Sequence, residues 1–147
     1  MRTDYRTSAG RHWSDAEFLR GDRTGPNLGR LPNADQLYGF AAECALKAVL
    51  VGLNARTRPD GSLDEQGKRV HIDRLWREYH ATISGRPARR LHVAWDGRDN
   101  PFADWSTDLR YAADENLPPE ESVNRHRRAA RACLGILERA GSPGRRR

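Results

Sequence analysis

The chain has 147 residues, which is enough for one domain with a core of its own. Apolar residues make up 37% and charged residues 31%, and the mean hydropathy is -0.89, so the core must be small and the surface highly charged. The first twenty residues hold four arginines and no apolar signal-peptide core, and no stretch is apolar enough to span a bilayer. We therefore expect a cytoplasmic protein with no membrane partner.

The basic balance leaves nucleic-acid binding open. The net charge is +6 and the isoelectric point is near 10.0. Of the 26 basic residues, however, 24 are arginine and only two are lysine, a skew that GC-rich codons also produce. Three arginines close the chain in a basic tail, residues 141–147, which we expect to be disordered behind a single helical core of residues 8–140.

The first predicted helix covers about residues 8–20, and Gly21 is a suitable C-terminal stop. Its apolar face, at helical spacing, consists of Ala9, Trp13, Ala16 and Leu19. Residues 21–32 contain five Gly or Pro and predict a loop.

The longest apolar run, residues 33–53, predicts the central helix. Asn33 suits the N-cap, and Gln36 three residues later completes a capping-box-like pattern. At about 100° per residue the polar side chains fall on one narrow line, which consists of Gln36, Glu43, Lys47 and Asn54. Apolar side chains cover nearly all the rest, so this helix belongs at the centre of a bundle, where Glu43 and Lys47 neutralise each other at i,i+4.

Residues 54–69 predict a second connection, with a turn at Pro59, Asp60 and Gly61. A third helix follows at residues 70–84 and ends at Gly85. Its apolar face consists of Ile72, Leu75, Trp76, Tyr79 and Ile83.

Residues 86–117 are the hardest to interpret. Apolar side chains alternate over a short stretch, which fits a strand or a helical turn: Leu91, Val93 and Trp95. Residues 100–105 predict a tight turn that places Phe102 and Trp105 on the core, and residues 107–117 fit one or two helical turns.

The last predicted helix starts with Pro119 at its first position, and Glu120 and Glu121 suit its positive end. Gly141 and Pro143 end it. Its apolar face consists of Val123, Ala130, Cys133, Leu134 and Leu137. Four main helices with short connections predict an all-α bundle.

Sites for a metal or a cofactor are not indicated. Cys44 and Cys133 lie far apart on apolar faces, so we expect buried thiols. The sequence has no glycine-rich phosphate loop after a strand, no metal-ligand spacing and no signalled nucleophile. We therefore expect neither cofactor nor metal.

Arginine and histidine remain as catalytic candidates. Arg74 and His80 fit the spacing R-x5-H, as do Arg86 and His92, although 24 arginines and 5 histidines produce such spacings by chance. In an enzyme that acts on RNA, His80 would transfer a proton and Arg74 would stabilise the phosphorane charge. The alternative is a solvated arginine and a surface or packed imidazole, and six helical residues also place the two side chains about 120° apart.

Binding candidates are more numerous. Glu43 and Lys47 form either the polar floor of a pocket or a partly buried pair that fixes the orientation of the helix. Residues at the start of the third helix and before the last could meet at one end of the bundle: His71, Asp73, Asp108, Arg110 and Tyr111. A basic cluster on the last helix is either a solvated face or a phosphate contact: Arg125, His126, Arg127, Arg128 and Arg131.

The central segment LYGFAAECALKAVL resembles the second helix of HEPN domains, whose small-residue-rich runs end in a similar E-x-x-x-K pattern. The order of the surrounding segments is also similar: an HW-x-DAE helix, a loop, the central helix, VHIDRLW, and an RY dipeptide before the last helix. The resemblance covers about residues 8–140. It implies a four- to five-helix up-and-down bundle that commonly forms a homodimer and binds or acts on RNA or nucleotides, often in toxin–antitoxin or defence settings.

Active members of that family resemble one another in an R-x4–6-H motif that cuts RNA without a metal. Here Arg110 and Tyr111 stand at the expected place, but no histidine follows within six residues; His126 comes sixteen positions later, beside Arg125. The resemblance therefore implies a module that binds RNA, a nucleotide or a partner protein. The alternatives are a metal-independent endoribonuclease that uses Arg74 and His80, and a structural adaptor without enzymatic activity.

Overall fold

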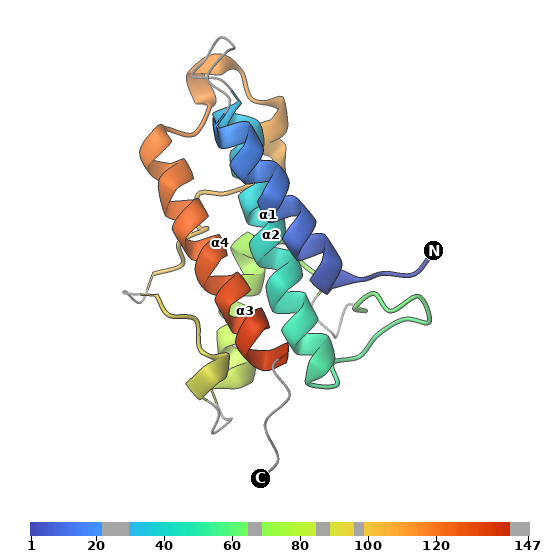
Figure 1. Ribbon diagram of the computed structural model, residues 1–147. Coiled ribbons are helices and arrows are strands. Elements are labelled where there is room, and N and C mark those ends of the chain that lie inside the picture. Colours follow the sequence, from blue (N-terminus) through green and yellow to red (C-terminus); the bar gives the residue numbers. More distant parts are fainter. Residues whose placement is uncertain (22–29, 65–68, 85–88, 96–98, 142–147) are drawn as a thin grey trace.

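The computed structural model describes residues 1–21, 30–64, 69–84, 89–95 and 99–141, and in these residues the fold is all-helical. The four helices are α1 (Tyr5–Gly21), α2 (Leu31–Gly52), α3 (Ile72–Ile83) and α4 (Glu120–Gly141). Three short 3-10 turns separate α3 from α4: η1 (Arg89–Leu91), η2 (Thr107–Tyr111) and η3 (Asp114–Asn116). This arrangement, shown in Figure 1, confirms the predicted all-α bundle.

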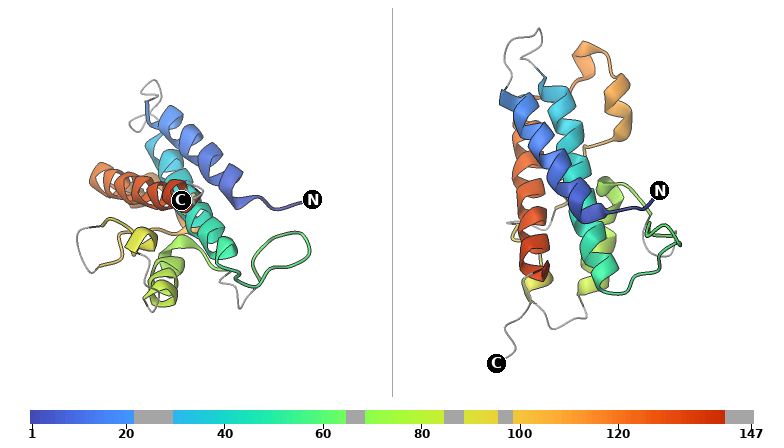
Figure 2. Two further views of the ribbon diagram at one scale, coloured as in Figure 1. Left: turned by 60° about the horizontal axis from the view of Figure 1, so that its bottom comes forward. Right: turned by 45° about the vertical axis from the view of Figure 1, so that its right-hand side comes forward.

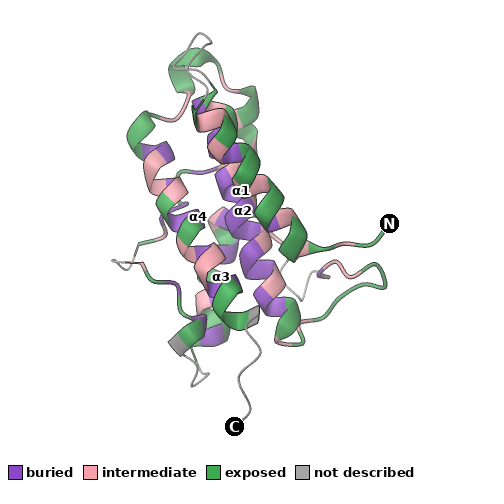
Figure 3. Cartoon of the chain, viewed as in Figure 1, coloured by how far each residue is buried: buried purple, intermediate pink, exposed green. Residues whose placement is uncertain are grey.

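The central position of α2 is confirmed. Helices α1, α3 and α4 surround it, and α1 and α4 contact α2 far more than they contact each other (Figure 2). Every residue from 34 to 50 is buried or half-buried, as the purple and pink segments of Figure 3 show. Although α2 is this apolar, no helix in the described part of the chain has the length and apolarity to cross a membrane.

The expected up-and-down order of the helices is wrong. Contacts between α1 and α2 pair Tyr38 with Glu17 and Lys47 with Tyr5, so these two helices are antiparallel. Contacts between α1 and α4 pair Arg127 with Glu17 and Asn124 with Arg20, so these two are antiparallel as well. Helices α2 and α4 therefore run in the same direction (Figure 1). The long segment between α3 and α4 makes this possible, because it returns the chain to the end of the bundle where α2 begins.

The predicted start of α2 and the last residue of its polar line need correction. The helix begins at Leu31, with Arg30 at the N-cap and proline in the first turn, so Asn33 is not the cap. The Gln36 amide closes no capping box and instead donates to the carbonyl of Ser106 at 2.8 Å. Asn54 lies beyond the helix with φ of 65°, a left-handed conformation that asparagine tolerates.

The other helices agree with the sequence pattern to within a few residues. All five predicted apolar residues of α3 are buried, and those of α1 and α4 are buried or half-buried. Gly21 and Gly141 are the last helical residues rather than the stops after them, and Pro119 precedes α4. The predicted turn at residues 59–61 is present, and Gly61 has φ of 87°.

Some expectations fall on residues outside the described ranges. They concern most of the loop at 21–32, part of the connection at 54–69, the end of the third helix at Gly85, Arg86, and the tail 142–147.

The segment after α3 folds onto α2 through residues 100–106, here named the 100–106 turn. Phe102 and Trp105 are buried, as predicted, and the Trp105 indole N–H donates to the carbonyl of Asp35 at 3.1 Å. Leu91 and Val93 are buried too, but they belong to a 3-10 turn and coil rather than to a strand. The Tyr79 hydroxyl donates to the Leu91 carbonyl at 2.5 Å and fixes this stretch to α3.

Candidate functional site

Three of the predicted binding residues meet on one side of α2. The Lys47 ammonium lies 2.6 Å from Oε1 of Glu43, and the exposed fractions of these two side chains are 7% and 9%. The other carboxylate oxygen, Oε2, lies 3.1 Å from Nδ1 of His71, whose side chain is 56% exposed. A buried ion pair thus supports an imidazole that is open to solvent. We name these three residues, with His12 and Phe40, the His71 site.

Local structure explains how these groups meet. Residues 43 and 47 are i,i+4 neighbours on α2, so their side chains lie on one face. His71 is the N-cap residue of α3 with an extended backbone, and its side chain does not cap that helix. Its ring is therefore available to Glu43, and the connection before α3 brings it to α2.

Aromatic rings from other elements complete the site. The Phe40 ring centroid lies 5.8 Å from that of His12 on α1 and 6.3 Å from that of His71. Trp105, from the 100–106 turn, meets Phe40 edge-on at 5.5 Å and lies 6.4 Å from the His71 ring. Sequence reasoning missed His12, Phe40 and Trp105 as site residues because only the fold brings α1 and the turn to this face. The HW-x-DAE segment was the one available signal.

The contact with Glu43 determines which ring nitrogen of His71 carries the hydrogen. An ionised carboxylate only accepts, so Nδ1–H of His71 donates to Glu43, and Nε2 of this largely exposed ring is the nitrogen left for a ligand. Burial lowers the pKa of His12, and the neighbouring Arg11 lowers it further, while Glu43 acts in the opposite direction. The site therefore offers two imidazoles, one oriented by a carboxylate, beside a partly exposed phenyl ring.

The structure does not bring the catalytic candidates together. The Arg74 side chain is exposed on α3. His80 packs its ring 4.7 Å from that of Trp76, and its Nδ1 lies 2.7 Å from the Trp76 carbonyl. Burial lowers the pKa of His80. These contacts are those of a packed imidazole, and no contact joins it to Arg74 among the described residues.

The expected meeting at one end of the bundle takes a different form. Asp108, Arg110 and Tyr111 lie on η2, at the upper end in Figure 1, and all three are exposed. The Arg110 guanidinium lies 4.7 Å from the Tyr111 ring centroid. The contact from this part of the chain to His71 comes instead from Trp105. Asp73 uses its backbone carbonyl to accept from the Asn100 amide at 2.6 Å.

The basic cluster on α4 is divided between core and surface. Arg128 and Arg131 are exposed, whereas His126 is fully buried. Arg125 binds Asp104, and Nε of Arg127 donates to Glu17 at 2.6 Å. Position 126 follows the buried Val123 by three residues and precedes the buried Ala130 by four, so the helical period could have placed it inside. Phosphate binding by Arg125, His126 and Arg128 as one surface is therefore not what this geometry offers.

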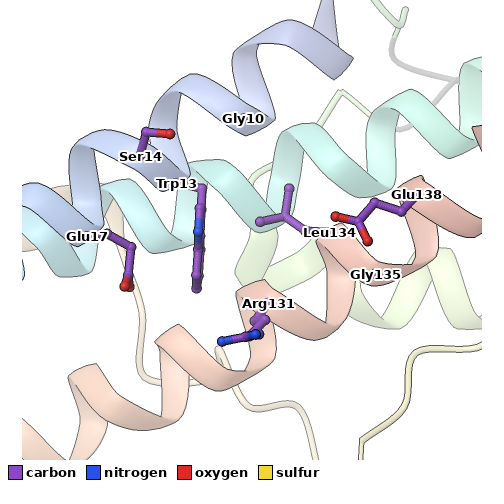
Figure 4. A pocket seen from close by; sticks show the side chains of 8 residues that line it. All are labelled: Gly10, Trp13, Ser14, Glu17, Arg131, Leu134, Gly135 and Glu138. Carbon is purple, nitrogen blue, oxygen red and sulfur yellow. The ribbon is translucent and has the colours of Figure 1, made fainter.

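A separate groove of about 520 Å³ lies between α1 and α4 (Figure 4). Its lining residues are Gly10, Trp13, Ser14, Glu17, Arg131, Leu134, Gly135 and Glu138. The Glu17 carboxylate accepts from the Tyr38 hydroxyl at 2.7 Å and from Arg127, and these bonds lower its pKa. Of the predicted binding residues, only Arg131 of the basic cluster lines this groove.

Neither cysteine belongs to a site. Both thiols are free; Cys133 is buried and Cys44 half-buried, and burial raises the pKa of the Cys44 thiol to about 12. Across the described residues, no group of three or more His, Cys, Asp or Glu could hold a metal ion. No protein-family model, curated protein or solved structure matches the chain.

Proposed function

We propose that this protein is a small HEPN-like binding module that holds a nucleotide unit, free or within single-stranded RNA, at the His71 site. The observation that carries the proposal is the buried Glu43–Lys47 pair beneath the exposed His71 ring. Burying two charges costs several kcal/mol per ion by rough estimate, and apolar side chains of similar volume often stabilise a core as well. A buried pair that also orients an exposed imidazole therefore favours a role in binding over a purely structural one.

The chemistry of the site suits a nucleotide. Partly exposed rings of Phe40 and His71 offer a surface for a base, and base–aromatic stacking contributes about 1–3 kcal/mol per base. Nε2 of His71 and the His12 ring can bond to a phosphate or a ribose hydroxyl. The net charge of +6 favours a polyanion over a neutral ligand.

Calorimetric titration tests the proposal. The probes are the four nucleoside 5′-monophosphates and a six-nucleotide single-stranded RNA of mixed sequence, at 50 and 200 mM salt. His71→Ala should weaken binding about tenfold or more, which is about 1.4 kcal/mol. His92→Ala removes an exposed imidazole elsewhere on the surface and is the matched control.

The two ligand sources give different results. Binding of monophosphates supports a free nucleotide, and binding of RNA alone supports a single-stranded RNA segment. The proposal fails when no probe binds the folded wild type, or when His71→Ala and His92→Ala bind as tightly as it does.

The endoribonuclease alternative is tested with the same proteins. Incubation with total RNA and EDTA should give cleavage that His80→Ala and Arg74→Ala abolish when those residues are catalytic. Intact RNA after incubation with clean wild type argues against this alternative, and intact RNA combined with tight binding favours the module.

The HEPN resemblance also leads us to propose a homodimer. Phe18 on α1 and Tyr111 on η2 are each 76% exposed, and α1 ends near the end of the bundle that carries η2 (Figure 1). Light scattering on the eluting protein measures its mass. A dimer that Phe18→Glu or Tyr111→Glu converts to a monomer supports an interface that includes the substituted residue, and a monomeric wild type contradicts the proposed homodimer.

A further inference from the structure

His126 joins three elements inside the protein. Its Nδ1 lies 2.6 Å from Oδ1 of Asp35 on α2, and its Nε2 lies 2.8 Å from Oδ1 of Asp104 in the 100–106 turn. The ring is fully buried and stacks on Phe102, with centroids 5.4 Å apart and planes 17° from parallel. Arg125, one residue earlier on α4, binds the other oxygen of Asp104.

The two carboxylates define the charge of this ring. Each ring nitrogen faces an oxygen that accepts, so both nitrogens must donate and the ring is an imidazolium. Two carboxylates are then matched by His126 and Arg125. Burial alone would lower the pKa of His126, but the bonds and charges of Asp35 and Asp104 outweigh burial and raise it. The second oxygen of Asp35 is buried without a hydrogen-bond partner among the described residues, so His126 supplies the hydrogen bond that this carboxylate receives.

The same turn carries Trp105, which packs against two residues of the His71 site. Trp105 directly follows Asp104, and its indole N–H donates to the carbonyl of Asp35. Asp35 thus holds His126 through its side chain and Trp105 through its backbone. Trp105 in turn packs against Phe40 and His71.

We infer that His126 is a positioning residue for the His71 site. The hydrogen bonds of its imidazolium to Asp35 and Asp104, here named the clasp, join the 100–106 turn to α2 and so hold Trp105 against Phe40 and His71. This inference rests on the proposed function, since it assigns a role in that site to a residue that no ligand there would touch. Loss of one ring proton turns a donor into a lone pair facing a carboxylate, which breaks one of the two bonds and loosens the turn.

The direction of the pH effect follows. The folded pKa of His126 lies above its ordinary value of 6.5, so the clasp is complete below pH 6.5 and is lost as pH rises through the higher folded value. The charged groups that bear on it are Asp35 from α2, Asp104 from the turn and, through Asp104, Arg125 from α4.

Hydrogen exchange of the Trp105 indole N–H, followed by NMR without ligand, tests the clasp. Protection should fall as pH rises through the titration of His126, whose ring resonances are recorded in the same samples. Asp104→Asn should move both midpoints down by roughly one unit or more, because it removes one of two adjacent negative charges. His126→Gln should leave the indole weakly protected at every pH, and His92→Ala should leave the profile unchanged.

Binding of the RNA hexamer, measured over the same pH range, links the clasp to the site. Affinity should fall with the indole protection, and Asp104→Asn should move that fall by the same amount although Asp104 does not touch His71. The inference is overturned when protection of the indole N–H in wild type does not change with pH. It is also overturned when Asp104→Asn does not change the pH profile of hexamer binding. In both cases the proposed function stands. A responsive indole in a protein that binds neither hexamer nor monophosphate overturns the proposed function and the role of His126 in it.

Discussion

Residue 39 is a glycine, and its lack of a side chain makes room for Trp105. A Cβ on Gly39 would lie 2.1 Å from Cε2 and 2.3 Å from Nε1 of the indole, far inside contact distance. The indole is rigid and held by its bond to Asp35, so it cannot move aside without displacing the turn. Gly39 is therefore required by packing, although glycine lowers helix propensity.

We predict that Gly39→Ala destabilises the protein by about 1–3 kcal/mol or more, because overpacking outweighs the gain of about 1 kcal/mol in helix propensity. The free energy of unfolding in urea measures the effect. Gly10→Ala in α1 is the control: a Cβ there meets nothing within 4 Å, and it should stabilise by roughly 0.5–1 kcal/mol. Equal stability of Gly39→Ala and wild type would contradict this packing.

The Glu43–Lys47 pair gives a second prediction at this scale. Lys47→Met leaves a buried carboxylate with His71 as its remaining partner and should cost about 3–5 kcal/mol. Lys47→Met combined with Glu43→Leu should recover most of that loss. The pair Arg56–Asp64, in which the arginine is exposed and the aspartate half-buried, provides the control, and Arg56→Ala should cost at most about 1 kcal/mol. Urea unfolding compares the three variants, and a double variant no more stable than Lys47→Met alone contradicts the prediction.

Sequence periodicity could place single residues only where the helix was already known. The burial of Glu43 and Lys47 follows from the apolar side chains that cover the rest of α2. The spacing of apolar residues in α4 could equally have placed His126 in the core. The partners of His126 could not be predicted, because Asp35 is 91 residues away and Asp104 is 22. The exposed state of His71 likewise depends on where the connection before α3 lies.

At the scale of elements, the 100–106 turn is attached to α3 as well as to α2. The Asn100 amide donates to the Asp73 carbonyl at 2.6 Å, and its carbonyl oxygen accepts from the Phe102 N–H at 2.9 Å. One side chain thus shapes the turn and joins it to the first residues of α3, next to His71.

Asn100→Ala should cost about 1–2 kcal/mol, because two hydrogen bonds of roughly 0.5–1.5 kcal/mol each are lost. It should also speed exchange of the Trp105 indole N–H, since the turn is held less firmly. Asn116→Ala, an exposed asparagine in η3, should change stability by less than about 0.5 kcal/mol. Thermal unfolding and NMR exchange are the measurements, and an Asn100→Ala protein that matches Asn116→Ala in both shows that the turn does not depend on this side chain.

The four helices were predictable because their apolar faces repeat locally at 3.6 residues, as in the five buried residues of α3. The start of α2 was misjudged since Pro32 opens a helix as well as an asparagine cap does, and local rules do not choose between them. The direction of α4 could not be predicted from the sequence, because it depends on the end of the bundle at which the chain arrives before Glu120.

At the scale of the whole molecule, α2 holds the bundle together and a few polar contacts join its neighbours. Glu17 on α1 accepts from Arg127 on α4 and from Tyr38 on α2, so one carboxylate ties three helices. Arg20 donates to Asn124 at 2.8 Å further along the same pair of helices. Because α1 and α4 otherwise contact each other little, with the groove between them, these bonds set their spacing.

This arrangement predicts stability that falls in acid. Bonds from Arg127, outweighing burial, lower the folded pKa of Glu17 below 4.5; Arg125 and His126 together outweigh burial at Asp104 and bring its pKa to about 2. A carboxylate with a lowered folded pKa stabilises the protein above its unfolded pKa, and that contribution disappears as pH falls through the folded value. The free energy of unfolding in urea should therefore decline from about pH 5 downward, with the Asp104 contribution the last to go. Glu17→Gln should flatten the upper part of this decline, whereas Asp15→Asn, which removes an exposed carboxylate of the same helix, is the matched control. The prediction is contradicted when the free energy of unfolding declines in acid as steeply in Glu17→Gln as in Asp15→Asn. In that case α1 and α4 keep their spacing through packing on α2 alone, and the bond between Glu17 and Arg127 contributes nothing to the stability of the bundle.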